Sequence, residues 1–178
     1  MADLKGTKTY DNLAAAFSGE SQARNKYTFY ASKARKEGYV QIAKFFEETA
    51  ANEKEHAEVW FKYFHGIGGT VENLVDAAAG EHYEWTEMYK EFAETARAEG
   101  FNEIALQMEK VGQVEAEHEQ RYLKLKENIE TGKVFKRDEP VKWQCGNCGF
   151  IYEGKDAVEE CPACKHPKAY FQLVENNF

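Results

Sequence analysis

Residues 40–64 read VQIAKFFEETAANEKEHAEVWFKYF, and residues 102–130 read NEIALQMEKVGQVEAEHEQRYLKLKENIE. In both stretches apolar residues recur every three or four positions, which is the pattern of a helix that packs into a bundle. A Glu-x-x-His pair lies on the apolar face of each stretch, Glu53 with His56 and Glu115 with His118. A buried carboxylate is costly unless a partner compensates it. The sequence therefore predicts that these pairs bind a cation.

The helical part of the chain is an internal repeat. Four helices are predicted: one begins at a cap formed by Thr9 or Asp11 and ends near Gly38, and three span residues 40–64, 71–99 and 102–130. Gly19-Glu20 matches Gly80-Glu81 at an offset of 61 residues, whereas Gly38 matches Gly100 and both Glu-x-x-His pairs match at an offset of 62. The repeat predicts an all-α four-helix bundle built from a duplicated helical hairpin.

Glutamates also lie on the apolar faces of the first and third predicted helices. Glu20 and Glu81 are about as far from the hairpin turns as the Glu-x-x-His pairs are, given a rise of ~1.5 Å per residue. Four carboxylates and two imidazoles suit two iron or manganese ions. Di-iron carboxylate bundles use this donor set, with one Glu from each of two helices and Glu-x-x-His from the other two. The predicted metal ligands are Glu20, Glu53, His56, Glu81, Glu115 and His118.

Two further residues are candidates for the same site. Glu84 follows Glu81 by three positions and is either a seventh ligand or a solvent-facing residue at the edge of the core. Tyr27 lies two turns after Glu20 and either hydrogen-bonds a ligand or packs in the core. Tyr89 is expected to pack and His82 to lie on the surface. Gly112, about one turn before Glu115, leaves room for a small substrate or permits close helix contact.

The end of the chain differs in composition from the rest. All three prolines and all four cysteines follow residue 139, and Gly132 closes the helical region. We expect a helical domain at residues 1–132, a connector at 133–142 and a small domain at 143–178. Two Cys-x-x-Cys motifs predict a four-thiolate metal site for iron or zinc, formed by Cys145, Cys148, Cys161 and Cys164. Spacing alone leaves iron and zinc open.

Bulk composition excludes several functional classes. The net charge of -8, without a stripe of Lys and Arg, disfavours nucleic-acid binding. No apolar run approaches the ~20 residues of a membrane span. The first residues, MADLKGTKTYDNL, contain no apolar segment typical of a secretory signal, so we expect a cytoplasmic protein without membrane partners.

With both sets of motifs in view, the chain resembles the rubrerythrin family over essentially its whole length. The residues that carry the resemblance are Glu20, Glu53-x-x-His56, Gly80-Glu81-x-x-Glu84-Trp85, Glu115-x-x-His118, Cys145-x-x-Cys148-Gly149 and Cys161-Pro162-x-Cys164. The resemblance implies a di-iron ferritin-like bundle joined to a rubredoxin-like domain that holds one iron. This chain departs from the family pattern at one position, because Lys165 stands where the second cysteine motif often has Gly.

The same resemblance implies an activity. Rubrerythrins are non-haem peroxidases of oxidative-stress defence that reduce hydrogen peroxide to water. Their electrons come from NAD(P)H through a separate rubredoxin reductase or rubredoxin and enter at the rubredoxin-like iron. In the family one iron exchanges His for the extra Glu on oxidation, which maps to His56 and Glu84. Homodimers are typical.

Three alternatives compete with this interpretation. A ferroxidase or iron-handling ferritin-like protein would share the bundle but has no use for an attached four-cysteine domain. An oxidase of organic substrates would need a larger pocket. A structural bundle fused to a zinc ribbon would be colourless.

Overall fold

The computed structural model describes residues 4–175, so residues 1–3 and 176–178, at the ends of the predicted domains, lie outside the described residues. The chain divides into two compact units between Gly68 and Gly69. The first unit contains α1 (Lys8–Lys36) and α2 (Val40–Phe64). The second contains the helices α3 (Thr70–Tyr83), η1 (Glu84–Met88), α4 (Tyr89–Ala98), α5 (Asn102–Glu130) and η2 (Lys168–Tyr170), and the strands β1 (Lys136–Cys145), β2 (Ile151–Asp156) and β3 (Phe171–Leu173). Among the helices of residues 4–175, none is long and apolar enough to cross a membrane.

The first helix begins earlier than the sequence suggested. Thr7 is the N-cap, and its Oγ1 accepts a hydrogen bond of 3.2 Å from the backbone N–H of Tyr10. The predicted cap at Thr9 or Asp11 is therefore wrong, because both residues lie inside α1. Asp11 instead lies in the first turn, where a negative charge interacts favourably with the helix dipole.

Each helical pair turns at a glycine, as predicted. Gly38, which follows α1, has φ +88°, and Gly100, which follows α4, has φ +89°. A residue with a side chain is disfavoured at this left-handed conformation. The N–H of Tyr39 donates to the carbonyl of Ala34 at 2.9 Å, and that of Phe101 donates to Ala96 at 2.8 Å. These bonds end both helices in the same way and allow the chain to reverse.

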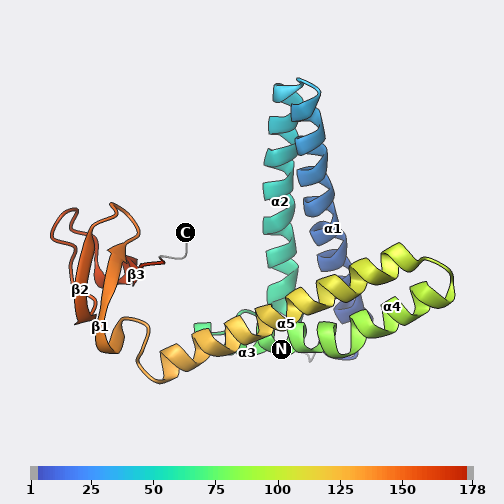
Figure 1. Cartoon of the computed structure of the whole chain (residues 1–178). Coiled ribbons are helices and arrows are strands. Elements are labelled where there is room, and N and C mark those ends of the chain that lie inside the picture. The colour runs from blue at the N-terminus through green and yellow to red at the C-terminus, as the bar shows by residue number, and fades with distance from the viewer. Residues whose placement is uncertain (1–3, 176–178) are drawn as a thin grey trace. The chain divides into compact units, whose positions relative to one another are not determined.

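Small residues fill the interface within each hairpin. Figure 1 shows α1 and α2 running side by side. The buried residues of the first hairpin core are Ala31, Ala34 and Ala43, and those of the second are Ala93, Ala96 and Ala105. The two sets match at the offset of 62 residues. The ion pairs Arg35–Glu47 and Arg97–Glu109 match at the same offset. The duplicated hairpin predicted from the sequence is therefore confirmed.

The helix predicted for residues 71–99 is not continuous. α3 passes into a π-helical turn, η1, before α4 begins. The backbone N–H of Tyr89 donates to the carbonyl of Glu84, five residues back, instead of the four of an α-helix. A π turn accommodates one more residue than an α-helical turn of the same height, so η1 accounts for the change of offset from 61 to 62. α1 has no such interruption.

The small domain is a three-stranded antiparallel sheet in the order β2-β1-β3. Its core is a cluster around the fully buried Trp143, whose Nε1 donates to the carbonyl of Gly154 at 3.0 Å. Two of the four cysteines, Cys145 and Cys161, belong to this core, so the metal site and the packing of the domain depend on each other.

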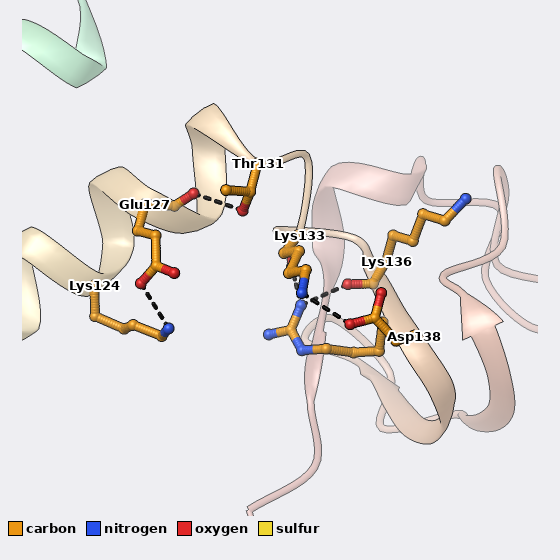
Figure 2. Close-up of polar contacts among 7 residues, drawn as sticks. Lys124, Glu127, Thr131, Lys133, Lys136 and Asp138 are labelled. Carbon is orange, nitrogen blue, oxygen red and sulfur yellow. Dashed lines mark hydrogen bonds and ion pairs between the residues drawn. The ribbon is translucent and has the colours of Figure 1, made fainter.

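Polar contacts order the segment between α5 and β1 (Figure 2). Thr131 Oγ1 donates to the carbonyl of Glu127 at 2.7 Å, and Lys124 pairs with the Glu127 carboxylate at 2.7 Å. Beyond the helix, Lys133 pairs with Asp138 at 2.8 Å, and Arg137 donates to the carbonyl of Lys133. These contacts join the end of the helix to the start of the sheet.

Candidate metal centres

The first hairpin brings together one set of predicted ligands. Glu20 of α1 and Glu53 and His56 of α2 offer ligand atoms that all lie within 4.8 Å of one another. The three-residue spacing puts Glu53 and His56 on one helix face, and Nδ1 of the imidazole lies 2.9 Å from Oε2 of the carboxylate. We call these three residues the first ligand set.

The second hairpin repeats this arrangement. Glu81 of α3 and Glu115 and His118 of α5 form the second ligand set, again with ligand atoms within 4.8 Å of one another. His118 Nδ1 lies 2.7 Å from Glu115 Oε2 and 3.7 Å from Glu81 Oε2. Side-chain exposure is low for the carboxylates, at 13% for Glu115 and 20% for Glu81.

Electrostatics in the second set favour a bound cation. Burial raises the pKa of Glu81, and the hydrogen bond and negative charge of Glu115 raise it further; His118 lowers it and Glu84 raises it. Two carboxylates held this close repel each other unless a proton or metal lies between them. Two carboxylates and one imidazole per set fit iron, since oxygen donors with a borderline nitrogen suit this ion. The donor sets therefore fit a di-iron centre.

Glu84 lies beside the second ligand set without belonging to it. The residue is partly exposed at the start of η1, and its charge contributes to the raised pKa values of both Glu81 and Tyr89. Tyr27 lies against Phe46, with ring centroids 6.3 Å apart. Its described ring contacts are thus aromatic.

Tyr89 packs against α5, as the sequence predicts, and it also lies close enough to the second ligand set to be affected by its charges. Burial raises the pKa of Tyr89, followed by the charges of Glu84, Glu115 and Glu81. The tyrosine also packs on α5, where a Cβ added at Gly112 would meet its Cβ at 3.3 Å. Gly112 therefore permits close helix contact, one of the two roles expected for it. The offset of 62 pairs Tyr89 with Tyr27, which is the signal that could have revealed its position.

Glu119 is a second residue that the sequence did not reveal. Its carboxylate accepts a hydrogen bond of 2.5 Å from Trp85 Nε1 and lies 3.1 Å from His82 Nδ1. The hydrogen bond from Trp85 is the largest cause of a lowered pKa for Glu119, and His82 also lowers it. His82 is exposed, as expected, but it has a partner. In the repeat, Glu119 replaces the buried Ala57, and that replacement was the available signal.

The four cysteines form the third metal site. Their sulfurs lie within 4.8 Å of one another, with distances of 3.7 Å between Cys145 and Cys164 and between Cys148 and Cys161. Sulfurs about 2.3 Å from a tetrahedral ion are about 3.8 Å apart, whereas a disulfide needs about 2.05 Å. The geometry therefore fits a four-thiolate metal site and excludes disulfides.

The pKa values of two of the crowded sulfurs, Cys148 and Cys164, are shifted in opposite directions. The pKa of Cys164 is lowered to about 6, first by a hydrogen bond from the backbone of His166 and then by bonds from Cys148 and neighbouring groups, against burial. For Cys148, the backbone hydrogen bond of Phe150 lowers the pKa, but bonds with Cys164 and the other thiols, together with burial, raise it to about 12. A metal ion would hold all four as thiolates.

Known protein families match both the helical region and the cysteine-containing region of the chain. The rubrerythrin family model matches residues 11–126, and the model of the rubredoxin-like domain of rubrerythrin matches residues 143–172. Rubrerythrin of Porphyromonas gingivalis is 52% identical over 98% of this chain and 94% of its own length. Rubrerythrin-1 of Clostridium acetobutylicum is 49% identical, and rubrerythrin of Nitratidesulfovibrio vulgaris is 46% identical, each over the full length of both chains. The chain, with its ferritin-like helices and rubredoxin-like sheet, belongs to the rubrerythrin family.

Proposed function

We propose that this protein is a non-haem peroxidase that reduces hydrogen peroxide to water with electrons from NAD(P)H. The observation that carries the proposal is the presence, in one chain, of two Glu-Glu-His ligand sets and a four-cysteine site. The ligand sets suit a small oxidant, and the cysteine site suits one-electron transfer. Membership of the rubrerythrin family supports an oxidoreductase of this type.

The metal-binding side chains fall into groups that would hold different iron ions. We assign the two irons of the di-iron centre to the two ligand sets, with Glu84 as an additional ligand, and one iron to Cys145, Cys148, Cys161 and Cys164. When bound, the di-iron centre supplies the two electrons that cleave the O–O bond. In this assignment the carboxylates of Glu53 and Glu115, together with those of Glu20 and Glu81, would hold the ions.

Protons must accompany these electrons, because peroxide takes up two electrons and two protons to form two waters. Burial, followed by the charges of Glu84, Glu115 and Glu81, raises the pKa of Tyr89, so its hydroxyl stays protonated at neutral pH and is available to donate a proton near these carboxylates. We assign a proton-relay role to Glu84 and Tyr27 and extend it to Tyr89, because Tyr89 and Tyr27 occupy matching positions in the repeat.

The small cysteine-containing domain is the proposed entry point for electrons. The cysteine site of the domain at residues 143–178 would hold an iron that accepts single electrons from a separate rubredoxin reductase or rubredoxin. Residues 133–142 are the connector to the domain at residues 1–132, where the ligand sets would use these electrons. We further propose that the protein acts as a cytoplasmic homodimer.

The test follows NAD(P)H-driven peroxide consumption with a rubredoxin reductase. The parent protein should consume peroxide, whereas a Cys145→Ser/Cys161→Ser variant should lose steady-state turnover but still react once with peroxide after chemical reduction. Rapid oxidation of added ferrous iron by oxygen, without peroxide turnover, would instead identify a ferroxidase. Zinc in the four-cysteine site of protein grown with ample iron would refute the proposed electron route.

A further inference from the structure

The carboxylate of Glu119 links α5 to the chain on both sides of Glu84. His82 precedes Glu84 by two residues at the end of α3, and Trp85 follows it in η1. Both side chains meet the same carboxylate, at 3.1 Å from Nδ1 and 2.5 Å from Nε1. Glu119 is 13% exposed and, within the described chain, belongs to neither ligand set.

The first hairpin provides an internal comparison. The position that matches Glu119 is Ala57, which is buried at 7% exposure. The matching helix, α1, runs without interruption from Lys8 to Lys36, and it has Ala23 where the second hairpin has Glu84. The π turn, the extra carboxylate and Glu119 therefore occur together in one hairpin and are absent from the other.

A π turn needs contacts that hold it. Its backbone hydrogen bonds span five residues, and such turns are rare because this geometry is less favourable than that of an α-helix. Glu119 fixes one residue before the turn and one residue within it, so the helix cannot rotate locally without breaking a hydrogen bond to a charged acceptor. Thr86 Oγ1 adds a bond of 2.5 Å to the carbonyl of His82, which ties the turn to α3.

We propose that Glu119 is a positioning residue that, through Trp85 and His82, holds the π turn so that the Glu84 carboxylate faces the second ligand set. The inference rests on the proposed function of Glu84. Glu119 itself binds no metal in this account. Its contribution is to fix the direction of Glu84, in the way that outer hydrogen-bond partners orient metal ligands.

The first test compares three variants at Glu119 and Trp85 with a control. Loss of an outer partner of a metal site typically costs 10–100-fold, so Glu119→Ala should slow the oxidation of the reduced, iron-loaded protein by peroxide about 10-fold. Glu119→Gln keeps an acceptor for Trp85 and should recover most of the rate. Trp85→Phe keeps a ring but removes the donor, and should resemble Glu119→Ala. Glu117→Ala, an exposed position on the same helix, should react as the parent does.

The second test separates positioning from general support of the fold. Glu84→Ala should be slow, and Glu84→Ala/Glu119→Ala should be no slower, because Glu119 acts only through Glu84. If Glu119→Ala reacts at the parent rate, or slows Glu84→Ala by the same factor as it slows the parent, the proposal is wrong. If Glu84→Ala itself reacts at the parent rate, the proposed role of Glu84 fails instead. Iron content and thermal unfolding are measured for every variant, so that a slow reaction caused by lost metal or by unfolding is recognised. If Glu119→Ala and Trp85→Phe are both slow only because they lose iron or unfold, the proposal is overturned.

Discussion

At the scale of the residue, the two Cys-x-x-Cys motifs have the same backbone conformation at the next position but different residues there. Gly149 follows the first motif with φ +77°, and Lys165 follows the second with φ +63°. Each residue donates its N–H to the carbonyl of the first cysteine of its motif, at 2.8 Å for Gly149 and 2.9 Å for Lys165. The left-handed conformation costs a side-chain-bearing residue about 1–2 kcal/mol. The departure from glycine at position 165 is therefore a site of backbone strain.

Lys165→Gly should stabilise the small domain. Removal of the side chain relieves the strain, but glycine makes the unfolded chain more flexible, and this offsets part of the gain. The net increase in the free energy of unfolding should be about 0.5–1 kcal/mol. Chemical denaturation of the metal-loaded protein measures it. Gly149→Lys places the same strain in the first motif and should destabilise by a similar amount; a stabilising Gly149→Lys would contradict the account.

Glu81 predicts a dependence of stability on pH in the iron-free protein. Its folded-state pKa is raised above the ordinary value of 4.5, by burial first, so the folded state binds the proton more tightly than the unfolded state does. Its stabilising contribution is full below pH 4.5 and is lost as the pH rises through the folded-state pKa. Glu81→Gln should therefore be more stable than the parent at neutral pH, and the difference should vanish below about pH 4.5. Equal stability of the two proteins at all pH values would refute the electrostatic argument.

At the scale of the element, the sequence predicted the helices that carry a regular apolar pattern. The spans 40–64 and 102–130 agree with α2 and α5. The cap of the first helix was missed because three residues of similar capping ability, Thr7, Thr9 and Asp11, lie together. The π turn was missed because a hydrophobic pattern does not report hydrogen bonds, although the change of repeat offset recorded its extra residue. Glu119 was missed because its role depends on an opposite helix.

Deletion of Glu87 tests the origin of the π turn. Glu87 is exposed within η1, and its removal restores the spacing found in α1 between the ligand and the tyrosine. The variant should keep its helix content and its iron but react with peroxide as slowly as Glu84→Ala. Circular dichroism, iron analysis and stopped-flow kinetics measure these outcomes.

The matched control is deletion of Lys26 from α1, which has no extra residue to lose. That deletion rotates the following residues by about 100° and should lower stability clearly. A Glu87 deletion that destabilises as much as the Lys26 deletion would show that η1 is not an absorbed insertion.

At the scale of the whole molecule, the small domain depends on its metal more than the helices do. Cys145 and Cys161 form part of the core around Trp143, whereas the helical hairpins have alanine cores of their own. Removal of the cysteine-bound metal under reducing conditions should abolish the near-ultraviolet signal of Trp143 while far-ultraviolet helicity persists. Trp143→Phe identifies that signal. A retained Trp143 signal after metal removal would show that the domain folds without its ion.

Reduced iron in the two ligand sets should react with hydrogen peroxide, and a titration of the reduced protein measures this reaction. Anaerobic protein with about three irons per chain, two in the ligand sets and one in the cysteine site, is reduced and titrated with peroxide. The account predicts rapid oxidation, with one peroxide consumed for every two ferrous ions of the ligand sets, and loss of this reaction in Glu53→Ala/Glu115→Ala. Fully iron-loaded, reduced protein that leaves peroxide unreacted would contradict it.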